Sequence, residues 1–162
     1  VNQKVYRVNT VRELVHAAIT TPYPIVQRAI KGDEFCIDTI SDFSGEWITS
    51  VVGKKTKKDR GGKAEQLHIY QHPELEAIGK QIANALELKG PGNIDVIHST
   101  ETGVYYVLDI NPRLGLNCNA LSQAGINVAE IMIKLHRGMK PITEDLFFTP
   151  GIYSTHPSLN GK

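Results

Sequence analysis

The sequence contains very little cysteine, with Cys36 and Cys118 as the two examples among 162 residues. Two cysteines are too few for a disulfide framework, and each lies in or beside an apolar run, so we expect buried thiols. No apolar run approaches the ~20 residues that a membrane-spanning helix needs. No signal peptide is visible either. These absences predict a cytoplasmic protein with no membrane partner.

An excess of charge of one sign is also missing. The 18 Lys and Arg residues nearly balance the 17 Asp and Glu residues, which gives a net charge of +1. This balance does not indicate a nucleic-acid partner. The sequence has no internal repeat and no low-complexity segment. Its length and its 41% of hydrophobic residues are enough for one domain with a real core.

The residue patterns predict helices and strands in a mixed order. Helices are expected after the capping box of Thr10 and Glu13, from Pro73, and after Asn127. Strands are expected at residues 4–8, 25–30, 34–40, 47–52 and 67–70, in a hairpin around residue 102, and near residues 151–154. Residues 54–63 hold five lysines and are expected to be a flexible basic stretch. Because tight turns join the strands, we predict an α+β fold, a mostly antiparallel sheet with helices packed on one face.

Residues 93–115 carry most of the functional information. Asp95 and Asp109 each lie seven residues from a turn centred near Thr102, so they should face each other across an antiparallel hairpin. Directly opposed carboxylates lie about 5 Å apart at Cβ and repel each other unless a cation lies between them. Asn111 points to the same face as Asp109, and Arg113 follows two residues later. This set predicts a Mg²⁺ ion bound together with a phosphate group.

Two blocks of sequence resemble a known family. Residues 25–38, Ile-Val-Gln-Arg-Ala-Ile-Lys-Gly-Asp-Glu-Phe-Cys-Ile-Asp, resemble the adenine-binding hinge and following strand of the ATP-grasp superfamily. The run from Gly92 to the Asp-Ile-Asn-Pro-Arg of residues 109–113 resembles that family's metal-binding hairpin. The nearest likeness is to the C-terminal part of the ATP-grasp domain in the carbamoyl-phosphate synthetase large subunit and in carboxylate–amine ligases.

The resemblance implies a role for each matching residue. The backbone around Arg28, Ala29 and Ile30 would meet the adenine edge, and Glu34 would bind the ribose hydroxyls. The metal ligands would be Asp95, Asp109 and Asn111, holding one or two Mg²⁺ ions, or Mn²⁺ in their place, against the phosphates of ATP. Arg113 would contact the γ-phosphate or an acyl phosphate as the catalytic residue. Arg60 and Lys63 would either contact phosphate or belong to a solvated loop.

The sequence departs from the family pattern in two ways. Asp stands at positions 95 and 109, where relatives often carry the longer Gln or Glu. The family's lysine-bearing strand and glycine-rich phosphate loop also precede the part that resembles this sequence. We therefore expect residues 1–162 to be a partial ATP-grasp domain that needs the remainder of the ATP-grasp polypeptide and has little or no activity alone. The face that would meet that remainder could also pair two copies as a homodimer.

The implied function is an ATP-dependent, ADP-forming ligase that makes an acyl phosphate from a small carboxylate and lets an amine displace the phosphate. Phosphorylation of bicarbonate or carbamate, as in carbamoyl-phosphate synthetases, uses the same motifs and is an alternative. A non-catalytic nucleotide-binding module is a third alternative. The facing acids argue against the third alternative, because a scaffold does not need them.

Overall fold

The computed structural model describes residues 5–59 and 61–156, and the chain divides into two compact units, Val1–Ile30 and Lys31–Lys162. The first unit contains helix α1 (Val11–Thr20). The predicted capping box is confirmed, since the Glu13 amide donates to Thr10 Oγ1 at 3.2 Å and the Thr10 amide donates to Glu13 Oε2 at 3.3 Å. Residues 5–8 and 25–30 form no strand, so both strand predictions were wrong within the described residues. These apolar runs have no neighbouring strand to complete their hydrogen bonds.

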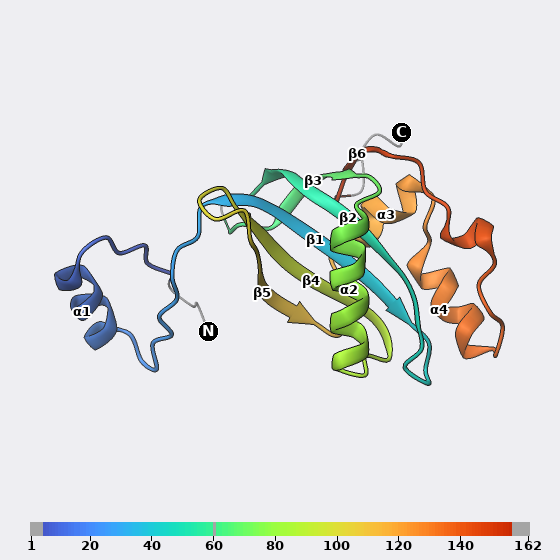
Figure 1. Ribbon diagram of the computed structural model, residues 1–162, viewed down its shortest axis with the longest axis horizontal. Helices are drawn as coiled ribbons and strands as arrows, with labels where there is room; N and C mark the ends of the chain where they lie inside the picture. Colours follow the sequence, from blue (N-terminus) through green and yellow to red (C-terminus); the bar gives the residue numbers. More distant parts are fainter. Residues whose placement is uncertain (1–4, 60, 157–162) are drawn as a thin grey trace. The chain divides into compact units, whose positions relative to one another are not determined.

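The second unit is built on one six-stranded sheet (Figure 1). The strands lie in the order β5-β4-β1-β2-β3-β6, and every neighbouring pair is antiparallel. Their bounds are β1 (Gly32–Ser41), β2 (Trp47–Lys58), β3 (Ala64–Ile69), β4 (Gly90–Ser99), β5 (Tyr105–Asn111) and β6 (Gly151–Ser154). The predicted α+β class with a mostly antiparallel sheet and packed helices is confirmed.

Strand β1 runs through the middle of the sheet and is buried on both faces. Successive side chains of a strand point to opposite faces, so one strand can supply two cores. Phe35 and Ile37 join the cluster that includes Leu75 of helix α2 (Pro73–Ala85). Cys36 and Ile40 join the cluster formed with helices α3 (Cys118–Ala124) and α4 (Val128–His136). Figure 1 shows α2 lying across the strands, apart from α3 and α4.

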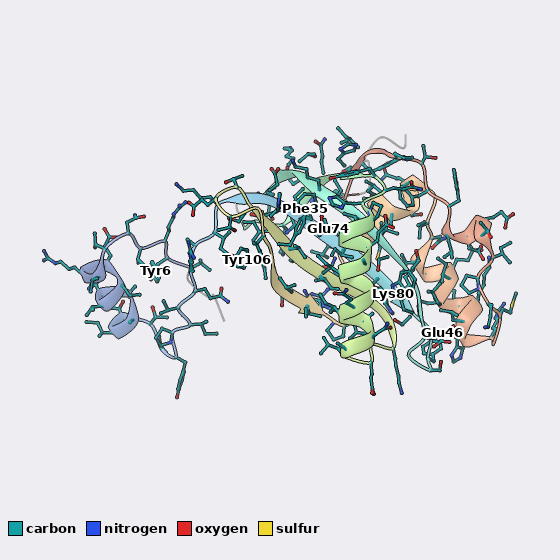
Figure 2. The ribbon with its side chains drawn as sticks, in the orientation of Figure 1. Tyr6, Phe35, Glu46, Glu74, Lys80 and Tyr106 are labelled. Atoms are coloured by element: carbon teal, nitrogen blue, oxygen red, sulfur yellow. The ribbon has the colours of Figure 1, made fainter. Side chains whose placement is uncertain are left out.

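Helix α2 lies close against the sheet because a glycine faces it. A Cβ atom at Gly79 would come within 2.7 Å of both Ile37 Cγ2 and Ser50 Oγ. The next residue of α2 is Lys80, which is labelled in Figure 2. Its ammonium lies 4.7 Å from the centre of the Trp47 ring, a cation–π contact. Together with the buried Leu75, these contacts fix α2 on the face opposite the predicted metal ligands.

Helices α3 and α4 are connected by a tight turn at Gly125, which has a φ angle of +118°. Asn127 caps α4 by accepting from the Glu130 amide at 3.2 Å, as its sequence pattern predicts. A short 3₁₀ helix, η1 (Thr143–Leu146), and strand β6 follow. Of the helices in the described ranges, none has the length and apolar character that a membrane span requires.

Candidate Mg²⁺–nucleotide site

The β4–β5 hairpin places the predicted metal ligands as expected. Asp95 is the direct partner of Asp109, and Asn93 is the partner of Asn111. A register shift follows between Asp95 and Val96, on the turn side of the acid pair. Asp109 is exposed and Asp95 is about a quarter exposed, so both carboxylates can reach a solute. The prediction that the two acids oppose each other is therefore confirmed as geometry.

A chain of hydrogen bonds links the three polar residues at the end of β5. Asn111 Nδ2 donates to Asp109 Oδ2 at 2.8 Å, and Arg113 Nη2 donates to Asn111 Oδ1 at 3.0 Å. Arg113 Nη1 also donates to the Leu114 carbonyl at 3.1 Å. The guanidinium group is thus held beside the acid pair, as the Asn-Pro-Arg spacing predicts. Arg113 is otherwise exposed and can present its remaining N–H groups to an anion.

Lys55 is a member of this face that the sequence interpretation missed. Its side chain is only 8% exposed, and its ammonium lies 2.9 Å from Asp95 Oδ1 and 3.6 Å from Glu34 Oε2. Burial alone would lower the pKa of Lys55, but the neighbouring carboxylates of Asp95 and Glu34 raise it above the usual value. Residues 54–58 belong to β2 rather than to a flexible stretch. Strand alternation from the buried Val51 would have placed Lys55 on this face.

Glu34 lies on β1 beside Lys55 and also receives Lys58, whose ammonium is 2.6 Å from Glu34 Oε1. Glu34 is about a quarter exposed. Its contact with ribose stays a prediction. What the geometry does establish is that Glu34 and Asp95 share one cation, since both contact the same Lys55 ammonium.

Asn93, two residues before Asp95 on β4, belongs to a buried polar cluster with Asp38 and Asn117. Asn93 Nδ2 donates to Asp38 Oδ1 at 2.9 Å, and Asn117 Nδ2 donates to Asp38 Oδ2 at 2.9 Å. Burial raises the pKa of Asp38 to about 6, against the lowering effect of these two hydrogen bonds. The cluster ties β1, β4 and the start of α3 together, and so anchors the loop that carries Arg113.

Gly115 allows that loop to pass directly over the polar cluster. A Cβ atom at this position would lie 2.9 Å from Asp38 Oδ1 and 3.0 Å from Asn93 Cγ. Cys36 also faces the acid pair, with its Sγ 3.4 Å from Asp95 Oδ1. Burial raises the pKa of the Cys36 thiol, so it acts here as a packed, protonated group.

The remaining predicted residues come from two other segments of the chain. Arg28, Ala29 and Ile30 belong to the first compact unit, in a segment without helix or strand before β1. Lys63 is exposed in the turn after β2, where its amide donates to Asp59 Oδ1 at 2.9 Å. Arg60 lies outside the described residues.

The donor set suits a hard divalent cation, because Asp95, Asp109 and Asn111 offer oxygen ligands of the kind that Mg²⁺ prefers. The site is not a ready-made metal cage. Across residues 5–59 and 61–156, no group of three or more His, Cys, Asp or Glu side chains is arranged to hold a metal ion. One oxygen of Asp95 is occupied by the Lys55 ammonium. The oxygen donors therefore suit Mg²⁺ in kind, and the remaining ligands of such an ion would come from a bound substrate or water.

Comparison with known sequences identifies the family. Residues 20–151 match the family described as "ATP-grasp in the biosynthetic pathway with Ter operon". The chain therefore belongs to the ATP-grasp family. The carbamoyl phosphate synthase large chain of Thermoanaerobacter sp. is 28% identical over 172 aligned positions, and that of Clostridium acetobutylicum is 27% identical over 147. The matches cover 96% and 84% of this chain, but the chain spans only 15% and 14% of the length of these relatives.

Solved structures share the fold at low sequence identity. N5-carboxyaminoimidazole synthase from Aspergillus clavatus, solved with ADP, matches 91% of this chain and 41% of its own with a TM-score of 0.64 and 9% identity. Rhizobium etli pyruvate carboxylase matches 87% of this chain and 16% of its own with a TM-score of 0.62 and 18% identity. The predicted ATP-grasp fold is confirmed by these likenesses.

Proposed function

We propose that this chain forms the metal-binding side of a Mg²⁺–ATP site in an ADP-forming ligase. The ligase would transfer the γ-phosphoryl group of ATP to a carboxylate oxygen, releasing ADP and leaving an acyl phosphate. An amine would then attack the carbonyl carbon and release inorganic phosphate and a proton. The observation that supports this proposal is the array of Asp95, Asp109, Asn111 and Arg113 on one face of a chain of the ATP-grasp family.

In this proposal Asp95, Asp109 and the amide oxygen of Asn111 hold one or two Mg²⁺ ions. The metal would supply positive charge that offsets the charge of a transferring phosphoryl group. Asn111 is held between Asp109 and Arg113, so its side chain would orient both neighbours. Arg113 would donate from its fixed guanidinium to the oxygens of the transferred phosphoryl group.

The nucleotide contacts are proposed from the family resemblance. Glu34, on the same face as Asp95, would accept hydrogen bonds from the ribose hydroxyls. The backbone of Arg28, Ala29 and Ile30 would contact the adenine edge. Lys63 and Arg60 would lie near the phosphates. Because the chain spans about one seventh of the length of its synthase relatives, these roles belong to a longer polypeptide.

The carbamoyl phosphate synthase relatives favour a second candidate substrate, bicarbonate or carbamate. The first chemical step is the same, since bicarbonate also presents an anionic oxygen to which the γ-phosphoryl group can be transferred. Formation of carbamoyl phosphate from bicarbonate and ammonia would identify this alternative. Formation of a stable amide from an organic carboxylate and an amine would favour the first candidate.

The proposal is tested by measuring ADP formation in the full-length polypeptide with panels of carboxylates and amines. Asp109→Asn is expected to lower the rate by about 100-fold or more, the loss typical of removing one electrostatic contact to a reacting group. Asp33→Asn is a matched control, because Asp33 is an acid on the opposite face of β1 that pairs with Lys54 at 2.7 Å. An Asp109→Asn enzyme that forms ADP at the wild-type rate would remove Asp109 from the mechanism.

A further inference from the structure

Lys55 occupies the carboxylate that the proposed metal would need. Its ammonium lies 2.9 Å from Asp95 Oδ1, and its side chain is 8% exposed, so the lysine is largely shielded from solvent while Asp95 stays about a quarter exposed. Asp109, on the other side of the proposed metal position, contacts no lysine within the described ranges. The face therefore holds one acid that is already neutralised and one that is not.

A second acceptor for the same lysine lies next to it. Glu34 Oε2 is 3.6 Å from the Lys55 ammonium, on the side away from Asp109. An ammonium that leaves Asp95 therefore still has a carboxylate nearby. It is not left as a buried, unpaired charge, which would be strongly destabilising.

We propose that Lys55 is a built-in counter-ion that competes with the divalent cation for Asp95. This inference rests on the proposed function, because it assumes the metal position between Asp95 and Asp109. In the metal-free chain Lys55 supplies the positive charge between strands β2 and β4. A divalent cation must displace it, and the repulsion between the two cations weakens the binding of free metal. A metal that arrives with a polyphosphate brings its own negative charge, so Lys55 selects the metal–nucleotide complex over the free ion.

The inference has a direct test in the 162-residue chain with Mn²⁺ alone as the probe. Mn²⁺ binding is followed by the loss of the free-ion electron paramagnetic resonance signal. Lys55→Met is expected to bind Mn²⁺ about tenfold more tightly than wild type, because the competing charge is gone. Lys55→Arg keeps the charge and is expected to bind as weakly as wild type. Lys54→Met is the matched control, since its ammonium pairs with Asp33 on the opposite face.

Two further results distinguish a wrong role for Lys55 from a wrong position for the metal. Equal Mn²⁺ affinity in wild type and Lys55→Met, with both chains folded by circular dichroism, would overturn the competition and make Lys55 a purely structural partner. A tightening in Lys55→Met that persists when Asp109→Asn is added would place the ion elsewhere, which would overturn the metal position itself. If Lys55→Met does not fold, Lys55→Gln provides the same comparison with a polar side chain. Loss of the tightening in the double variant supports both the inference and the proposed site.

Discussion

The buried carboxyl group of Asp38 makes the free energy of unfolding fall as pH rises. Burial raises its pKa from 3.8 to about 6, Asn117 and Asn93 oppose the rise by hydrogen bonding, and Asp95 adds to it. The folded chain therefore holds this proton more tightly than the unfolded chain does. The resulting contribution to stability is fully present below pH 3.8, declines as pH rises, and is lost above about pH 6. A difference of about 2 pKa units corresponds to about 3 kcal/mol.

The measurement is the free energy of unfolding by urea between pH 4 and 7, in wild type and Asp38→Asn. Subtracting the two curves cancels the groups that both proteins share. We expect wild type to lose about 2–3 kcal/mol relative to Asp38→Asn across this range. The absolute stability of the variant is less informative, because its amide cannot accept from both Asn93 and Asn117 as the carboxylate does.

Asp42 provides a control with the opposite sign. Its pKa is lowered by hydrogen bonds from the Ser44 hydroxyl and from the turn backbone, so its contribution is present above pH 3.8 and is lost as pH falls. The difference between wild type and Asp42→Asn should therefore move in the other direction at acid pH. A difference between wild type and Asp38→Asn that stays constant from pH 4 to 7 would show that Asp38 ionises in the folded chain at no cost, so its pKa would not be raised.

Two other predictions concern the packing around the same cluster. Gly115→Ala should destabilise the chain by about 1–3 kcal/mol in urea unfolding, because its Cβ would lie 2.9 Å from Asp38 Oδ1, and an unchanged midpoint would show that the loop yields freely. Cys36 is 3% exposed and burial raises the pKa of its thiol, so in a Cys118→Ser chain it should react with a thiol reagent only as the protein unfolds. Rapid labelling of that folded chain would contradict the packing described for β1.

The opposed acids could be predicted from the sequence because the two strands of the hairpin are close together in the chain. The turn near Thr102 pairs the strands, and a register shift between Asp95 and Val96 places Asp109, rather than Leu108, opposite Asp95. The capping box at Thr10 and the cap at Asn127 were predictable for the same reason, since each is complete within four residues. Local patterns of this kind predict the structure correctly where no tertiary contact overrides them.

The missed residues all depend on contacts between distant segments. Lys55 was assigned to a flexible stretch, because a lysine-rich run has low strand propensity and nothing local reveals that β3 pairs with it. Helix α3 was missed because its preceding residue, Asn117, donates to Asp38 instead of capping the helix. The strand predicted at residues 25–30 did not form. Its β-branched residues suit a strand, but the described part of the first unit contains no second strand with which it could pair.

In the proposed function Asp95 and Asp109 hold the metal of a bound nucleotide. The most direct measurement is the affinity of Mn²⁺ for the full-length polypeptide in saturating ADP, compared between wild type, Asp109→Asn and the control Asp33→Asn. We expect the affinity for Mn²⁺ to fall at least about tenfold in Asp109→Asn and to stay unchanged in Asp33→Asn, because only the former removes an oxygen ligand. Equal affinity in all three proteins would mean that Asp109 is not a ligand of the metal.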